Sequence, residues 1–257
     1  MAVVEYEVTD RIGTITLNRP EKRNALSPGL IQTLHEIFLR AEQDDRCKVI
    51  VLRAEGEAFC SGADLGYLQQ LQQFTVDENL EDSRRLRDLL LLMYRLKKVI
   101  IAEVQGSAIA GGCGLMTVCD FAFTVPDAKF GYTEVRIGFV PALVSVFLIR
   151  KIGEARARQL LLTGKLVAAA EAHQMGLITE VVAPEKLSTS VRQLAASLIK
   201  NVSAASLQLT RRLIDEVQNY PLEEALERAA KENAIARGTD DCKKGVASFL
   251  NKQPLSW

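Results

Sequence analysis

A chain of 257 residues is long enough for one large domain, or for one domain with an appendage. Basic and acidic residues both number 32, and this zero net charge argues against binding to nucleic acid or to an anionic membrane surface. No apolar run approaches the ~20 residues of a membrane helix, and no signal peptide is expected at the start. The five cysteines include no C-x-x-C pair, which favours reduced thiols in the cytoplasm.

The chain begins with a predicted β-hairpin, because residues 3–19 alternate in polarity around a D-R-I-G turn. Ser27 as an N-cap and Pro28 at the first helical position then predict the start of a helix. A short buried strand follows at 47–56. The next element is a long amphipathic helix at 78–98.

Strands and helices continue to alternate beyond this helix, which is entered through a polar loop near 75–78. The later elements are a strand at 99–106, a strand with an irregular piece at 120–135, helices near 144–151, 154–163 and 168–178, and a strand at 179–184. This alternation predicts an α/β core over 1–195. The region 196–257 is expected to be helical and to pack on another subunit.

Two glycine-containing turns share one design. The segments "GEAFCSGADL" and "GSAIAGGCGL" each follow a predicted strand and open a predicted helix. Glycine permits a sharp turn and the close approach of a ligand to the main chain, and the first N–H groups of a helix lack partners. Two such turns side by side would aim two N–H groups at one oxygen, which is an oxyanion hole. Alternatively, each turn is only a tight connection between packed elements.

The sequence resembles the crotonase family of enoyl-CoA hydratases and isomerases. The segments that carry this resemblance span nearly the whole chain: "ITLNRPEKRNALS", "AFCSGADL", "GSAIAGGCGLMTVCDFAF", "AKFGYTEVRIGFVP", "ARQLLLTGKLVAAAEAHQMGLITEVV" and "GVASFLNK". The resemblance implies a spiral of ββα units with a C-terminal helical trimerisation region, assembled as homotrimers or as hexamers. It also implies an acyl-CoA thioester substrate whose carbonyl becomes an enolate.

The resemblance implies which residues form the site. The N–H groups of Gly111 and Ala63 are expected to form the oxyanion hole, so that neither a metal nor a cofactor beyond the coenzyme A of the substrate is needed. The positions implied for binding the substrate and its coenzyme A are Lys22, Arg23, Ala25, Leu26, Ala63, Asp64, Leu65, Gly111, Phe249 and Lys252. The last two are expected to reach coenzyme A from a neighbouring subunit.

The acid/base residues depart from the pattern of the hydratases that the chain resembles. Those hydratases have two glutamates, and this chain has Gly114 at the first position and Glu134 at the second. We expect Glu134 to be the catalytic base, with its pKa raised by apolar neighbours. The alternative for Glu134 is a structural carboxylate that pairs with Arg136 or with another cation.

A single glutamate favours one reaction of the family over another. One base suffices to move a double bond, whereas hydration also requires a positioned water. The predicted function is therefore that of an enoyl-CoA hydratase/isomerase that leans towards isomerisation. The alternative is a non-catalytic acyl-CoA-binding homologue. Two other branches of the family are disfavoured because Pro141 and Ala142 stand where those branches carry aspartates. The selectivity of the enzyme for acyl-chain length is expected to depend on residues 66–82.

Overall fold

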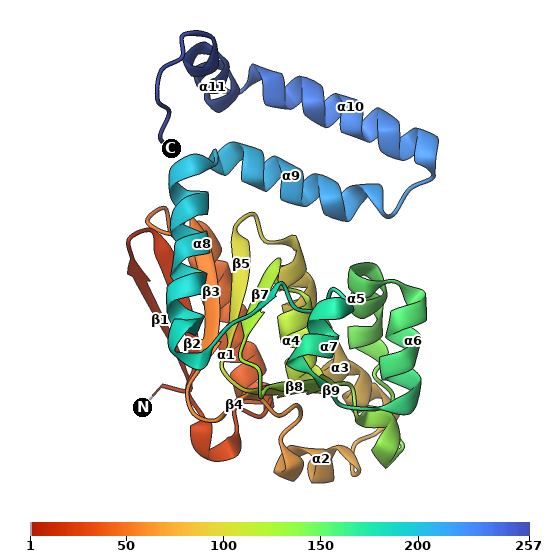
Figure 1. The fold of residues 1–257 in the computed structure, drawn as a ribbon. Helices are drawn as coiled ribbons and strands as arrows, with labels where there is room; N and C mark the ends of the chain where they lie inside the picture. The colour runs from red at the N-terminus through yellow and green to blue at the C-terminus, as the bar shows by residue number, and fades with distance from the viewer. Residues whose placement is uncertain (1) are drawn as a thin grey trace.

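Two β-sheets form the core of the computed structural model, which describes residues 2–257 (Figure 1). The larger sheet has the strand order β1 (Val4–Thr9), β2 (Ile12–Leu17), β3 (Val49–Ala54), β5 (Val99–Val104), β7 (Phe121–Thr124) and β10 (Glu180–Val181). The smaller sheet has the order β4 (Ala58–Cys60), β6 (Ser107–Ile109), β8 (Lys129–Gly131) and β9 (Val167–Ala168). Only the pairs β1–β2 and β8–β9 are antiparallel among the described strands.

Successive strands belong alternately to the larger and the smaller sheet, in a repeated order. In each repeat a strand of the larger sheet (β3, β5 or β7) is followed by a strand of the smaller sheet (β4, β6 or β8) and then by helix. The helices that follow are α2 (Leu65–Leu71) with α3 (Val76–Arg95), then α4 (Gly111–Thr117), then α5 (Ala142–Ile152). This arrangement confirms the α/β class and the spiral of ββα units.

The short strands of the smaller sheet correct one expectation. A strand, a turn and a helix were expected in direct succession at both glycine-containing segments. The structure instead inserts the three-residue strands β4 and β6 before the turns, where they pair in parallel with each other. Runs of three residues carry too little alternation to be recognised as strands in a sequence.

The hairpin and the first helix are confirmed by local geometry. Asp10 and Arg11 form the turn between β1 and β2 with φ angles of 52° and 64°, the left-handed pair that two-residue hairpins require. Helix α1 (Pro28–Gln43) begins with Ser27, whose side chain accepts the N–H of Leu30. The buried face of α1 packs into the core.

Helix α3 begins earlier than its expected start at residue 78. Thr75 is its N-cap, and the side chain of Glu78 accepts the N–H of Thr75 while the Thr75 hydroxyl accepts the N–H of Glu78. This reciprocal capping satisfies the first N–H groups of the helix. The polar residues expected in a loop near 75–78 therefore form the first turn of α3.

Further helices complete the chain: α6 (Glu154–Thr163), α7 (Ala169–Gln174), α8 (Leu187–Asn201), α9 (Ala204–Val217), α10 (Leu222–Gly238) and α11 (Asp240–Leu250). Helix α8 packs on strands of the larger sheet, and the expected boundary at 195/196 falls inside it. Helices α9, α10 and α11 extend beyond the sheets (Figure 1) and bury none of their residues within the single chain. No helix in 2–257 has the length and apolar character to cross a membrane.

Candidate active site

One cavity of about 520 Å³ brings together the three residues predicted to act in catalysis. Ala63 follows β4, Gly111 opens α4, and Glu134 opens the 3₁₀ turn η2 (Glu134–Ile137). The apolar side chains around them come from four regions: Leu26, Ile31, Leu65, Leu68, Leu71, Leu86, Ile137, Phe139, Val140, Pro141, Leu143 and Val144. This mostly apolar lining surrounds a small set of polar groups, as in typical small-molecule sites.

The two glycine-containing turns lie against each other, as the sequence predicted for a shared site. A Cβ atom added to Gly62 would lie 3.0 Å from Cβ of Ala110, and one added to Gly112 would lie 2.3 Å from the carbonyl oxygen of Cys60. Gly62 also has a φ of +91°, which favours glycine. Close packing of the turns therefore leaves no room for side chains at these glycines.

The N–H of Ala63 points away from the segment that contains Leu26. Leu26 and Ala63 form an isolated parallel bridge in which Leu26 donates to the Gly62 carbonyl (2.7 Å) and Asp64 donates to the Leu26 carbonyl (2.9 Å). Because hydrogen-bonding directions alternate along extended chain, the N–H of Ala63 points away from Leu26. Ala63 is itself part of the cavity lining.

Gly111 is the first residue of α4, and its N–H precedes those that pair within the helix. The residue before it, Ala110, has a φ of 51° and a ψ of −125°, a conformation that L-residues rarely adopt. This strained turn starts α4 at the cavity wall, where Gly111 and Ala110 are both lining residues. A Cβ atom on Gly111 would lie 2.9 Å from Cδ1 of Leu26.

Glu134 is a partly buried carboxylate, and one of its two oxygens has no hydrogen-bond partner in residues 2–257. Its Oε2 atom is buried and has no hydrogen-bond partner among the described residues. Burial raises the pKa of Glu134 above its ordinary value, while a hydrogen bond from its own backbone N–H acts in the opposite direction. No ion pair joins Glu134 to Arg136 within 2–257, so the structural pairing considered as an alternative is not observed.

Gly114, which the resemblance places at the position of the first glutamate, faces a side chain of α5. A Cβ atom on Gly114 would lie 2.4 Å from Cγ1 of Val144, which is buried and projects from α5. Gly114 is therefore closely packed and does not face an empty space. The cavity is lined by Val144, Pro141 and Ala142 and not by Gly114.

The positions expected to bind coenzyme A are only partly gathered at this cavity. Lys22 and Arg23 are exposed, whereas Ala25 and Leu26 are buried and Leu26 lines the cavity. The exposed basic side chains of Lys22 and Arg23 are accessible to phosphate groups.

Asp64 and Leu65 differ in their surroundings. The carboxylate of Asp64 accepts the N–H of Gly66 (3.0 Å) as the N-cap of α2 and pairs with Arg19 at 3.4 Å. Asp64 is not among the cavity-lining residues, so its side chain has a local structural role. Leu65 lines the cavity and is 79% exposed.

Phe249 and Lys252 lie far from the cavity of their own chain. Phe249 belongs to α11 and is 83% exposed, and Lys252 follows the same helix. Helix α11 and helix α2, which borders the cavity, are at opposite ends of the molecule (Figure 1). These two residues therefore do not meet the other predicted site residues within one subunit.

Asn24 supports the site without lining the cavity. Asn24 is buried; its amide donates to the carbonyls of Glu55 (2.8 Å) and Ala58 (2.9 Å) and its Oδ1 accepts the N–H of Arg19 (2.8 Å). This side chain ties the loop before Leu26 to β4. Asn24 was missed in the sequence, where the only signal was its place between predicted site residues.

The other polar groups near the glycines have structural partners or are buried. Glu103 accepts a hydrogen bond from Ser188 (2.7 Å), and Asp120 pairs with Arg211 (2.8 Å). Cys60 and Cys113 are buried, and burial raises the pKa of each thiol to about 12. Both thiols therefore remain protonated and behave as small apolar side chains.

Comparison with known proteins identifies the family. The sequence model of the enoyl-CoA hydratase/isomerase family matches residues 7–257. The chain belongs to this family. It is 40% identical to a putative enoyl-CoA hydratase of Thermus thermophilus, over 95% of this chain and 96% of that protein, and 35% identical to a probable enoyl-CoA hydratase of Rhizobium meliloti, over 96% and 94%.

Solved structures agree with this assignment. The crystal structure of an enoyl-CoA hydratase from Mycobacterium smegmatis superposes with a TM-score of 0.94 at 30% identity, covering 100% of this chain and 99% of that one. The crystal structure of a putative enoyl-CoA hydratase/isomerase (crotonase) from Legionella pneumophila superposes with a TM-score of 0.89 at 34% identity, covering 98% of both chains. The protein is thus an enzyme of the crotonase family with the enoyl-CoA hydratase/isomerase type of activity.

Proposed function

We propose that this enoyl-CoA hydratase/isomerase moves a double bond of an acyl-CoA thioester from the β,γ to the α,β position, with Glu134 as its single acid/base group. The observation that carries the proposal is the unpartnered, buried Oε2 of Glu134 in the same cavity as Gly111 and Ala63. The carboxylate of Glu134 is the group that has the right chemistry for proton transfer and no structural partner.

In this mechanism the thioester oxygen accepts hydrogen bonds from the N–H groups of Ala63 and Gly111. Glu134 removes a proton from the α-carbon, and the electrons of that C–H bond delocalise into a dienolate with its negative charge on the thioester oxygen. As the carbonyl re-forms, the α,β double bond forms, and the electrons of the former β,γ double bond take the proton back from Glu134 at the γ-carbon. Two preorganised N–H donors stabilise the negative charge on the enolate oxygen, and each contributes about 3 kcal/mol. The glycine at 111 keeps side-chain bulk away from the thioester.

The filled space at Gly114 supports isomerisation over hydration. Hydration needs a group that positions water in addition to one that handles the α-proton. At the position of the first glutamate, the apolar Val144 occupies the space into which a side chain would project. Proton transfer between two carbons needs only Glu134.

Hydration by Glu134 alone is the second candidate function, because relatives are named for it. A crotonyl-CoA hydratase of Syntrophomonas wolfei is 28% identical over 98% of this chain, and an (E)-benzylidenesuccinyl-CoA hydratase of Thauera aromatica is 32% identical over 96%. In this reading Glu134 accepts a proton from the water as the water oxygen bonds to the β-carbon, the α,β π bond breaks, and Glu134 delivers a proton to the α-carbon.

Substrate binding and assembly complete the proposal. Coenzyme A is held at the exposed rim formed by Lys22 and Arg23 and beside Ala25 and Leu26, while Phe249 and Lys252 reach it from a neighbouring subunit. We infer that the neighbouring subunit belongs to a homotrimer, or to a hexamer built from two trimers. The backbone donors replace any metal or cofactor at the enolate oxygen, and the five free thiols support a reducing, cytoplasmic location.

The Glu134→Gln variant tests the assignment of the base. We expect its kcat to fall by ~10²–10⁴, the typical loss on removal of a general base, while the Kd for a saturated acyl-CoA changes only a few-fold. Stopped-flow or absorbance assays give kcat, and calorimetry gives Kd. Near-normal turnover by a correctly folded variant would remove Glu134 from the mechanism.

A further inference from the structure

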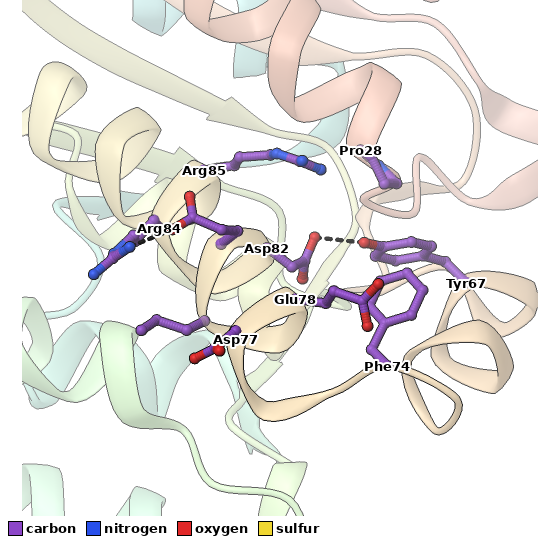
Figure 2. A pocket seen from close by; sticks show the side chains of 10 residues that line it. Pro28, Tyr67, Phe74, Asp77, Glu78, Asp82, Arg84 and Arg85 are labelled. Carbon is purple, nitrogen blue, oxygen red and sulfur yellow. Dashed lines mark hydrogen bonds and ion pairs between the residues drawn. The ribbon is translucent and has the colours of Figure 1, made fainter.

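Two residues separate the active-site cavity from a second cavity. Tyr67 of α2 and Asp82 of α3 line both spaces, and the Tyr67 hydroxyl donates a hydrogen bond to Oδ1 of Asp82 at 2.5 Å. Figure 2 shows this bond with the two side chains facing each other across the gap between α2 and α3. The pair therefore forms a shared wall.

The space behind this wall is unlike the active-site cavity. It measures about 750 Å³, and most of its lining is charged. The lining residues are Pro28, Tyr67, Phe74, Asp77, Glu78, Leu80, Glu81, Asp82, Arg84 and Arg85 (Figure 2). An apolar acyl chain gains no favourable burial by entering a space lined in this way.

The wall is held by few contacts. The ring of Tyr67 meets the ring of Phe74 edge-on at 6.3 Å between centroids, and the amide of Asn79 donates to the carbonyls of Leu71 (3.4 Å) and Phe74 (3.2 Å). Helix α2 buries none of its residues. Its position on α3 thus depends on the Tyr67–Asp82 bond and these neighbouring contacts.

We propose that the Tyr67–Asp82 pair is the end wall of the acyl cavity and restricts the enzyme to short acyl groups. This inference rests on the proposed function in taking the substrate to be an acyl-CoA. A long apolar chain that displaced Tyr67 would leave a hydroxyl and a carboxylate without their hydrogen bond. It would then enter the charged second cavity.

The neighbouring residues extend the argument. Leu68, Leu71 and Leu86 line only the active-site cavity and provide the apolar surface that the acyl group contacts. The polar pair therefore begins where this apolar surface ends. Both wall residues lie within 66–82, the segment in which the sequence predicted chain-length selectivity.

Tyr67→Ala is the direct test, because it removes the ring from the wall. The measurement is kcat/KM for four-carbon and twelve-carbon 3-enoyl-CoA thioesters with wild type and variant. We expect wild type to favour the short substrate, and the twelve-carbon to four-carbon ratio to rise at least ~10-fold in Tyr67→Ala, a typical effect of pocket size on discrimination. Tyr67→Phe, which keeps the ring, should shift the ratio less.

The matched control is Leu80→Ala, because Leu80 lines only the second cavity and lies on the same helix as Asp82. This variant should leave the ratio unchanged. An equal loss of kcat/KM at both chain lengths in Tyr67→Ala would assign Tyr67 a merely structural role and overturn the proposal. Equal use of both substrates by wild type would also overturn it.

A second readout separates this proposal from the proposed reaction. Calorimetric Kd values for saturated four-carbon and twelve-carbon acyl-CoA thioesters report cavity length without requiring turnover. If Tyr67→Ala reduces the preference for the short thioester in Kd, the wall is supported even where isomerisation fails. If Tyr67→Ala does not fold, Tyr67→Leu gives the same comparison, and an unchanged preference in a folded variant contradicts the wall.

Discussion

Gly114 and Val144 are in such close contact that a Cβ atom on Gly114 would lie 2.4 Å from Cγ1 of Val144. Real Cβ atoms do not approach a neighbour this closely, so a side chain at position 114 requires that Val144 move or be replaced. The absence of a carboxylate at Gly114 is accordingly matched by an apolar side chain on the facing helix α5.

The Gly114→Glu variant should therefore lose stability and not gain hydration. A clash with Val144 and a buried carboxylate without a partner both oppose folding, and overpacking alone costs about 1–3 kcal/mol. Chemical denaturation measures this loss, and hydration of a 2-enoyl-CoA measures the gain.

The double variant Gly114→Glu/Val144→Ala should recover part of the stability and raise hydration above that of wild type. Val144→Ala alone is the control for loss of the valine. A single Gly114→Glu variant that folds as well as wild type would show that the contact with Val144 relaxes easily.

Gly111 provides a test of the backbone donors. Gly111→Pro removes the N–H and should lower kcat by about 10²–10³, the loss observed when one oxyanion donor is removed. Gly111→Ala keeps the N–H and brings its Cβ only near the end of Leu26, so it should lose much less. Circular dichroism checks that both variants fold, and equal kcat values for Pro and Ala would contradict a role for the N–H.

The pH dependence of kcat/KM should report the burial of Glu134. A base acts only when it is deprotonated, so activity should fall as the pH decreases through the pKa of Glu134. Because burial raises this pKa above the ordinary 4.5, the acid-side inflection should lie above that value. A profile that stays flat down to pH 4.5 would mean that the reacting base is a different or a fully solvated group.

The sequence predicted more of the fold than of the contacts inside the site. Periodicity and capping residues located α1 and the hairpin, because these signals are local. The three-residue strands β4 and β6 were missed, since their pairing arises from contacts between distant segments. Resemblance to a family supplied the spiral arrangement.

In the candidate site, too, the residues were predicted from the sequence but the contacts between helices were not. Ala63, Gly111 and Glu134 were predicted and line one cavity. The contact of Gly114 with Val144 joins α4 to α5, and the bond of Tyr67 with Asp82 joins α2 to α3. Neither pairing produces a periodic pattern or a motif of fixed spacing in the sequence, because each depends on how two helices pack.

The most direct test of single-glutamate catalysis is the ratio of two rates of the wild-type enzyme. Isomerisation of a 3-enoyl-CoA and hydration of the 2-enoyl-CoA of equal chain length are measured under the same conditions with product analysis. We expect isomerisation to be faster and Glu134→Gln to lower its kcat by ~10²–10⁴. Hydration at an ordinary enzymatic kcat of ~10 s⁻¹ or more, without detectable isomerisation, would contradict single-glutamate isomerisation and show that Glu134 alone supports addition of water.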